Sequence, residues 1–200
     1  MLNRRSFLKT GTVLPTGLRH AIAQTKEQPL RAHASARGLV FGAAAGWPAL
    51  RDDAEYATHF AEECGILVPE NALKMGPVHP EPEKYNFEAG DYMAEFCKKN
   101  NMLMRGHTLA WHSQGWPWLK TIVNAQNARK YLEEHIRTVA GRYAGRMHSW
   151  DVVNEAIEVK DGHPDGLRKT PLRELLGDDY IEMAFRMARE ADPKALLCYN

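Results

Sequence analysis

The sequence has little that would tie it to nucleic acid, to a membrane surface or to a metal. Its 26 basic and 25 acidic residues give a formal net charge of +1, so no excess of one sign attracts a phosphate backbone or an anionic lipid surface. Only three cysteines are present, Cys64, Cys97 and Cys198, far apart and without CxxC spacing. Because three thiols cannot all pair, we expect small buried apolar residues rather than a disulfide or a metal site.

The N-terminal residues differ in character from the rest of the chain. Residues 3–9 (Asn-Arg-Arg-Ser-Phe-Leu-Lys) form a twin-arginine pattern, and a modestly apolar stretch and the small-x-small site at residues 21–23 follow it. The apolar stretch, residues 12–18, is far shorter than the roughly 20 residues that span a bilayer. We predict that residues 1–23 are an export signal of the twin-arginine type, which implies a periplasmic or secreted protein without a membrane anchor after cleavage. An ordinary basic N-terminus is the alternative.

From residue 38 onward, a short apolar run, a polar loop and an amphipathic helix recur. Residues 24–37, which precede this pattern, are polar and aperiodic and are predicted to be a flexible tether. The expected strands cover 38–45, 66–69, 102–106, 149–153 and 195–199, and the expected helices run from Asp52 or Asp53 to Gly65, then over about 92–99, 127–143 and 179–191. Strict alternation of strand and helix predicts an α/β fold with a parallel sheet covered by helices.

The long loops follow strands rather than helices, as in a TIM (β/α)8 barrel, where the active site lies at the carboxyl ends of the strands. A doubly wound sheet is the rival architecture, but no GxGxxG segment follows any expected strand. Such barrels have eight strands and about 250 residues. We therefore expect residues 38–200 to form about the first five β/α units of a longer, truncated catalytic domain.

Unusual polar side chains gather just after three of the expected strands. They are Glu70, Asn71 and Lys74 after the second strand, His107, Trp111, His112 and Gln114 after the third, and Asn154 and Glu155 at the end of the fourth. In a barrel of this kind the carboxyl ends of the strands meet at one mouth. The sequence therefore predicts that the three groups converge on one site.

Glu155 is the strongest candidate for catalysis. It stands where a strand leaves the apolar core, so we expect its carboxyl to be partly desolvated. Desolvation raises the pKa of a carboxyl group, which suits a general acid working near neutral pH. Alternation along a strand would place Asp151 and Glu155 on one face and Asn154 on the other, unless a bulge intervenes. A single strand-end glutamate is otherwise an ordinary solvated loop residue.

The histidines and tryptophans that follow the third expected strand also have two interpretations. His107 and His112 lack HExxH or i, i+4 spacing and have no nearby thiolate, so hydrogen bonding to a sugar is favoured over a metal site. Trp111, Trp116 and Trp118 lie close together, and aromatic faces pack well on the apolar faces of sugar rings. The other reading is a hydrophobic plug over the end of the barrel.

Three segments together resemble glycoside hydrolase family 10, the endo-1,4-β-xylanases. They are residues 70–74 (Glu-Asn-Ala-Leu-Lys), 105–112 (Arg-Gly-His-Thr-Leu-Ala-Trp-His) and 150–156 (Trp-Asp-Val-Val-Asn-Glu-Ala). The resemblance covers residue 38 to the end and implies a (β/α)8 barrel. There are two departures: Met75 stands where the family often has Trp, and the segment with Trp116 and Trp118 is shifted by one residue from the family's Ser-Gln-x-Pro-x-Trp.

The resemblance implies that Glu155 is the acid/base and that Asn154 holds the 2-hydroxyl of the sugar being cleaved. It also implies that the glycone subsites are lined by Glu70, Asn71, Lys74, His107, Trp111 and Gln114. The implied partner is xylan or a xylo-oligosaccharide, with neither a metal nor a cofactor. The family nucleophile lies in a Thr-Glu-Leu-Asp-like segment, and these 200 residues contain none. We therefore expect no xylan hydrolysis by this chain alone; a xylan-binding remnant and another β-1,4-glycanase, such as a cellulase, are the alternatives.

Overall fold

The computed structural model describes residues 28–200. Five parallel strands form one sheet in the order β1-β2-β3-β4-β5, so that each strand pairs with its neighbours in the sequence. The strands are β1 (Gly42–Ala45), β2 (Ile66–Pro69), β3 (Leu103–Trp111), β4 (Ser149–Asn154) and β5 (Leu196–Tyr199). The predicted export signal at residues 1–23 and the first part of the predicted tether lie outside the described residues.

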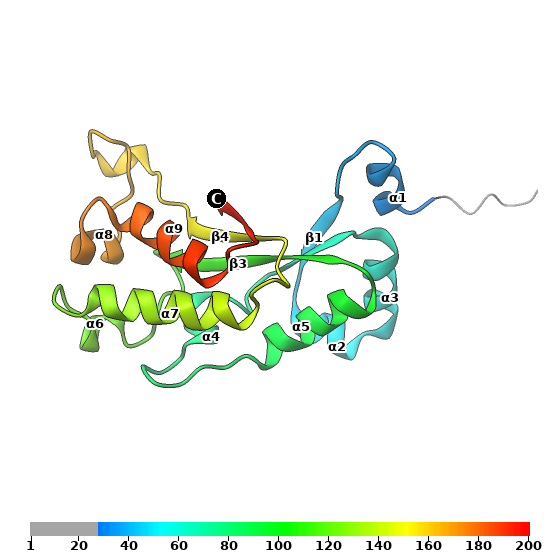
Figure 1. Ribbon diagram of the computed structural model, residues 1–200, viewed down its shortest axis with the longest axis horizontal. Coiled ribbons are helices and arrows are strands. Elements are labelled where there is room, and N and C mark those ends of the chain that lie inside the picture. The colour runs from blue at the N-terminus through cyan, green and yellow to red at the C-terminus, as the bar shows by residue number, and fades with distance from the viewer. Residues whose placement is uncertain (1–27) are drawn as a thin grey trace, which may run out of the picture.

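Helices connect the parallel strands, and α5 and α7 lie along one side of them (Figure 1). The longer helices are α3 (Ala54–Glu63), α5 (Glu88–Lys99), α7 (Ala128–Arg142) and α9 (Tyr180–Ala191). The shorter ones, which the sequence did not predict, are α1 (Leu30–Ser35), α2 (Trp47–Asp52), α4 (Met75–Val78), α6 (Leu119–Ile122) and α8 (Pro171–Leu176), with the 3-10 turn η1 at Val159–Asp161. The arrangement confirms an α/β fold of the partial-barrel type. No helix in the described part of the chain has the length and apolar character needed to cross a membrane.

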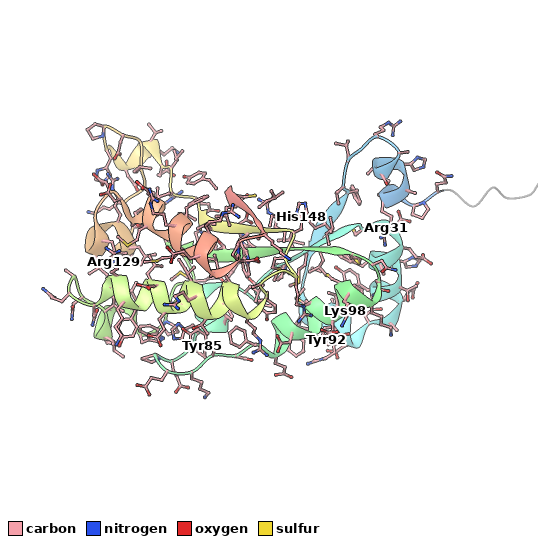
Figure 2. The ribbon with its side chains drawn as sticks, viewed as in Figure 1. Arg31, Tyr85, Tyr92, Lys98, Arg129 and His148 are labelled. Atoms are coloured by element: carbon pink, nitrogen blue, oxygen red, sulfur yellow. The ribbon has the colours of Figure 1, made fainter. Side chains whose placement is uncertain are left out.

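The structure differs from the predicted tether at its C-terminal part, where α1 forms. The Arg31 guanidinium donates to the carbonyl oxygens of Ala61 and Asn101, each at 2.9 Å, and the Leu30 amide donates to Glu63 at 2.7 Å. Figure 2 shows Arg31 on α1, at the end of the molecule where α3 lies. Because these bonds satisfy backbone groups at the ends of two helices, a polar segment without apolar periodicity is nevertheless ordered.

The expected helices form for the reasons that the sequence suggested. The Asp53 side chain accepts a hydrogen bond from the Tyr56 amide at 2.9 Å and so caps the N-terminus of α3. On α7, Leu132, Ile136 and Val139 are fully buried at helical spacing. Cys64 and Cys97 are buried free thiols, as expected, and Cys198 is half-buried and free.

Strands β3 and β4 approach closely because a glycine faces a tryptophan. Gly106 pairs with Trp150 in the parallel register, and a Cβ atom on Gly106 would overlap the six-membered ring of Trp150. The Trp150 ring is fully buried and contacts Tyr143, with ring centroids 6.3 Å apart. The absence of a side chain at residue 106 therefore lets the largest core residue lie flat against the neighbouring strand.

Two tryptophans of the loop that follows β3 form a buried cluster with two histidines. The indoles of Trp116 and Trp118 stack with centroids 4.9 Å apart. Trp116 Nε1 donates to His135 Nδ1 at 3.3 Å, and Trp118 Nε1 donates to the His79 carbonyl at 3.2 Å. Burial, and secondarily the neighbouring His79, lowers the pKa of His135 to about 3. Both tryptophans are almost inaccessible, so they form the hydrophobic plug and not a sugar platform.

Gly106→Ala is expected to lower the free energy of unfolding by about 1–3 kcal/mol, because the added methyl group overpacks the Trp150 ring. Urea unfolding of both proteins measures this difference. Gly141→Ala, near the end of α7, is the matched control: a Cβ there meets nothing within 4 Å, and alanine favours a helix over glycine by up to about 1 kcal/mol. Equal or greater stability of Gly106→Ala would contradict the packing argument.

Stability is also expected to fall as the pH is lowered from 7 to 5. The buried His135 stays neutral when folded, because its pKa is lowered to about 3, whereas the unfolded chain takes up a proton near pH 6.5. The unfolded state therefore binds more protons in this window, and His135 alone contributes a loss of about 2 kcal/mol. Urea unfolding at both pH values should show a smaller loss in His135→Gln and an unchanged loss in the control His59→Gln, at an exposed position of α3. The same loss in all three proteins would count against a buried neutral His135.

Candidate active site

The predicted site residues lie at the carboxyl ends of β2, β3 and β4. Strand β3 is longer than the sequence predicted and continues to Trp111, so His107 lies within the strand and not in the loop after it. The register between β3 and β4 shifts between His107 and Ala110, and the His107–Thr108 peptide bond is cis. Beyond this irregularity Trp111 pairs with Asn154, which brings the ends of the two strands together.

Glu155 follows β4 directly and has an unusual backbone. Its φ angle is 54°, in the left-handed region that residues other than glycine rarely adopt. Its amide donates to the Asn200 carbonyl at 2.7 Å. Its carboxylate accepts a hydrogen bond from Trp111 Nε1 at 2.9 Å, and His112 Nε2 lies 3.9 Å from the same oxygen. The end of β4 therefore directs a carboxylate to Trp111 and His112, two of the residues predicted to follow the third strand.

Half of the Glu155 side chain is exposed, so its carboxyl is partly shielded from solvent. The Trp111 indole and the His112 ring approach the carboxyl from β3 and from the loop after it. Asn154 and Glu155 follow the alternation expected along the strand. Strand β4 continues to Asn154, whose side chain is buried, whereas that of Glu155 is half exposed. The register of β4 also shifts between Asp151 and Val153. Within residues 28–200 the Asn154 side chain is not hydrogen-bonded to the Glu155 carboxylate; its Oδ1 accepts from Asn200 Nδ2 at 2.8 Å.

Lys74 lies over the Trp111 ring from the β2 side and is held by Asn71. Lys74 Nζ donates to Asn71 Oδ1 at 2.9 Å and lies 4.9 Å from the centroid of the Trp111 ring. An ammonium at this distance from an indole face is held by its attraction to the ring. Lys74 is only 9% exposed, so the cation sits at a fixed place beside the indole that contacts Glu155.

Asp151 joins β3 to β4 below the site, a role that the sequence did not predict. Its carboxylate accepts from the Arg105 guanidinium and from His107 Nδ1, the latter at 2.9 Å. Burial alone would raise the pKa of Asp151, but the hydrogen bonds from His107 and Arg105 outweigh it and lower the pKa below its usual value. His107 is thereby held by a buried carboxylate, with its ring centroid 6.4 Å from that of Trp111.

His112 and Arg168 are two further residues next to Glu155. Burial, followed by the positive charge of Arg168, lowers the pKa of His112, against the opposing effect of Glu155 and Asp161. Arg168 Nε donates to the main-chain carbonyl of Glu155 at 2.7 Å. No sequence motif pointed to Arg168, which follows β4 by 14 residues and reaches Glu155 through the return of its loop.

Glu70 and Gln114 are exposed at the same edge of the sheet. The Glu70 amide is fixed by the Ala45 carbonyl at 3.0 Å, and the Gln114 carbonyl accepts from the Gly76 amide at 2.9 Å. Within residues 28–200, neither side chain is hydrogen-bonded to the cluster of Asn71, Lys74, His107, Trp111 and Glu155. The structure thus places both beside the cluster without joining them to it.

The chemistry available at the cluster is proton transfer and hydrogen bonding. Glu155 offers an accessible carboxyl, with an indole donor, an ammonium and an amide close by. The Asp151 carboxylate is occupied by Arg105 and His107 and is not free to attack or to transfer a proton. No group of three histidine, cysteine or acidic side chains suited to hold a metal ion occurs in the part of the chain that the structure describes.

Comparison with known proteins places this arrangement in a family. The family model for glycosyl hydrolase family 10 matches residues 29–200. Endo-1,4-beta-xylanase B of Thermotoga neapolitana is 38% identical over 185 residues, covering 88% of this chain and 51% of the relative. Endo-1,4-beta-xylanase 2 of Claviceps purpurea is 42% identical over 144 residues, covering 72% of this chain and 43% of the relative.

Solved structures agree in fold. Xylanase XynB of Paenibacillus barcinonensis, complexed with a conduramine derivative, matches with a TM-score of 0.81 and 38% identity, over 88% of this chain and 53% of that one. Xylanase 10B of Thermotoga petrophila RKU-1, in complex with xylobiose, matches with a TM-score of 0.79 and 38% identity, over 86% and 52%. The chain therefore spans about half the length of these relatives. Since the family model matches residues 29–200, which is most of the chain, the chain belongs to glycosyl hydrolase family 10.

Proposed function

We propose that this chain is the N-terminal part of a retaining endo-1,4-β-xylanase in which Glu155 is the general acid/base. The observation that carries the proposal is the position of the Glu155 carboxyl: it leaves the end of β4, accepts a hydrogen bond from the Trp111 indole at 2.9 Å and remains accessible to a ligand. An acid/base must reach both a glycosidic oxygen and a water molecule, so an exposed and oriented carboxyl is what this chemistry needs.

The proposed reaction proceeds by double displacement through an oxocarbenium-like transition state. Glu155 protonates the leaving oxygen as a second carboxylate attacks the anomeric carbon. It then removes a proton from the water that hydrolyses the glycosyl-enzyme. The two carboxyl groups of such an enzyme lie about 5–5.5 Å apart. The Thr-Glu-Leu-Asp-like segment that carries the second carboxyl in this family does not occur in the 200 residues.

The sugar-binding roles are part of the same proposal. Glu70, Asn71, Lys74, His107, Trp111 and Gln114 would line the glycone subsites, and Asn154 would hold the 2-hydroxyl of the sugar being cleaved. The hydrogen bond between His107 and the buried Asp151 supports this assignment, because it fixes the imidazole. The indole and ammonium of Trp111 and Lys74 offer an apolar face and donors, which together suit a sugar ring.

The proposal extends to the substrate and to the location of the protein. The names of the relatives, and the xylobiose complex of the Thermotoga petrophila enzyme, favour xylan or xylo-oligosaccharides as substrates. The twin-arginine pattern of residues 3–9 supports export to the periplasm or beyond. No metal or cofactor is required by the proposed reaction.

The second candidate function is binding of xylan without hydrolysis, favoured by the absence of the nucleophile segment from this chain. The reading frame after the codon for Asn200 separates the two: a continuing frame with a Thr-Glu-x-Asp segment supports the enzyme, and a stop codon supports the remnant. A different barrel glycanase, such as a cellulase, is disfavoured by the His-Thr-Leu-Ala-Trp-His segment at residues 107–112.

The 200-residue chain by itself is expected not to release the phenol of an aryl xylobioside above the background rate. Protonation by Glu155 without an attacking carboxylate leaves the anomeric carbon without a nucleophile for the first displacement. The measurement is the absorbance of released phenol at high protein concentration. Titration with xylotriose in parallel shows whether the chain binds the sugar. Turnover above background that is lost in Glu155→Ala would contradict the expectation that this chain is inactive.

In a longer form of the protein that contains the nucleophile, Glu155→Ala is expected to lower kcat/KM on xylan by about 10²–10⁴-fold. The kcat/KM for an aryl xylobioside with a strongly acidic phenol should stay nearly normal, because its leaving oxygen needs no protonation in the first step, whereas its kcat should fall because Glu155 no longer activates water in the second. Glu190→Ala is the matched control, since it removes an exposed carboxylate from α9 and should change neither rate. A similar loss of kcat/KM on both substrates would argue against the acid/base role.

A further inference from the structure

The backbone of Glu155 is held in a conformation that it would not adopt without support. A residue other than glycine is strained in the left-handed region, and surrounding contacts must outweigh that strain. Glu155, with φ of 54°, has three such contacts. Its amide donates to the Asn200 carbonyl at 2.7 Å, its carboxylate accepts from the Trp111 indole at 2.9 Å, and its carbonyl accepts from Arg168 Nε at 2.7 Å.

Arg168 is well placed to fix this carbonyl. Its side chain is 22% exposed, and its Nη2 lies 3.6 Å from Glu158 Oε2. A guanidinium can donate from Nε and Nη2 at the same time in one plane. Both oxygens lie along the same edge of the guanidinium: Glu158 attracts it as an ion pair, and the bond from Nε is a charge-assisted one to a backbone oxygen.

The loop that carries Arg168 is closed on itself next to Glu155. Ile157 and Leu167 form an antiparallel bridge. The Glu158 amide donates to the Gly166 carbonyl at 2.9 Å, and the Arg168 amide donates to the Ala156 carbonyl at 2.6 Å. The main chain thus brings residue 168 back to the end of β4, and the side chain continues in the same direction to the next carbonyl along, that of Glu155.

We propose that Arg168 is a positioning residue for Glu155: by holding the Glu155 carbonyl, its guanidinium fixes the left-handed backbone that directs the Glu155 carboxylate to the Trp111 indole. The inference rests on the proposed function, because it concerns the aim of the proposed acid/base. Arg168 lies outside the three segments, 70–74, 105–112 and 150–156, that carry the family resemblance. Arg168 itself touches neither the carboxylate nor, in this role, the substrate.

A purely structural role would have a different effect. If Arg168 only closed the loop, its loss would disturb the bridge between Ile157 and Leu167 and would leave the contact between Trp111 and Glu155 unchanged. The indole Nε1–H of Trp111 reports that contact directly, because its chemical shift depends on the hydrogen bond to the carboxylate. The Trp150 indole, buried on β4 without a hydrogen-bond partner within the described residues, serves as an internal reference for the intact core.

The test uses the ¹⁵N-labelled 200-residue chain, with the Trp111 indole signal assigned by Trp111→Phe. In Arg168→Ala the Trp111 signal is expected to move toward the position of a free indole, with the Trp150 signal unchanged. Lys169→Ala is the matched control: it removes the same charge from the next residue, an exposed one, and should leave the Trp111 signal in place. An unchanged Trp111 signal in a folded Arg168→Ala protein would overturn the proposal, and so would an equal displacement in both variants.

A conservative variant covers the case in which Arg168→Ala does not fold. Arg168→Lys keeps the positive charge but lacks the planar fork that bonds the Glu155 carbonyl while facing Glu158. Displacement of the Trp111 signal in Arg168→Lys supports the proposal, and an unchanged signal overturns it. Xylotriose titration of the unaltered chain tests the proposed function separately: failure to bind would count against sugar binding, whereas the indole signal of Trp111 is read without any ligand.

Discussion

The site depends on one buried carboxylate between two strands. Asp151 on β4 is 2% exposed, and its two oxygens accept from Arg105 and His107 on β3, while its main-chain carbonyl accepts from Thr108 Oγ1 at 2.8 Å. A buried charge is tolerated only when it is paired and hydrogen-bonded, so β3 cannot slide along β4 without a large loss of stability. This fixed register is what places Trp111 opposite Asn154, and therefore beside Glu155.

The departures from regular strand geometry all lie at the edge where the site forms. Strand β3 is irregular between His107 and Ala110, β4 between Asp151 and Val153, and Glu155 turns into the left-handed region. Irregularities of this kind redirect side chains near active sites. Here the irregularity of β3 lies between His107, whose side chain contacts Asp151, and Trp111, whose side chain contacts Glu155.

The tryptophans show how residues of one type, close together in sequence, take different roles. Trp111 stays partly exposed beside Lys74 and Glu155, whereas Trp116 and Trp118 stack on each other over His79 and His135. The buried pair anchors the loop that carries Gln114, whose carbonyl bonds the Gly76 amide. Aromatic packing therefore anchors this loop, while the Gln114 side chain remains exposed.

The five strands of a parallel sheet, the four longer helices and the three polar groups at the strand ends could be predicted from the sequence, because alternating apolar runs and helix caps such as Asp53 are local signals. The first strand, expected from residue 38, begins only at Gly42. The sequence also determined the family through residues 70–74, 105–112 and 150–156. Only the tertiary structure decided that Trp116 and Trp118 are core residues, that Asp151 binds Arg105 and His107, that residues 30–35 form a helix and that Arg168 holds the Glu155 carbonyl. Each of these depends on contacts between residues far apart in the chain, or on a loop that closes on itself, and such contacts follow from the packing of the whole sheet and not from any local pattern.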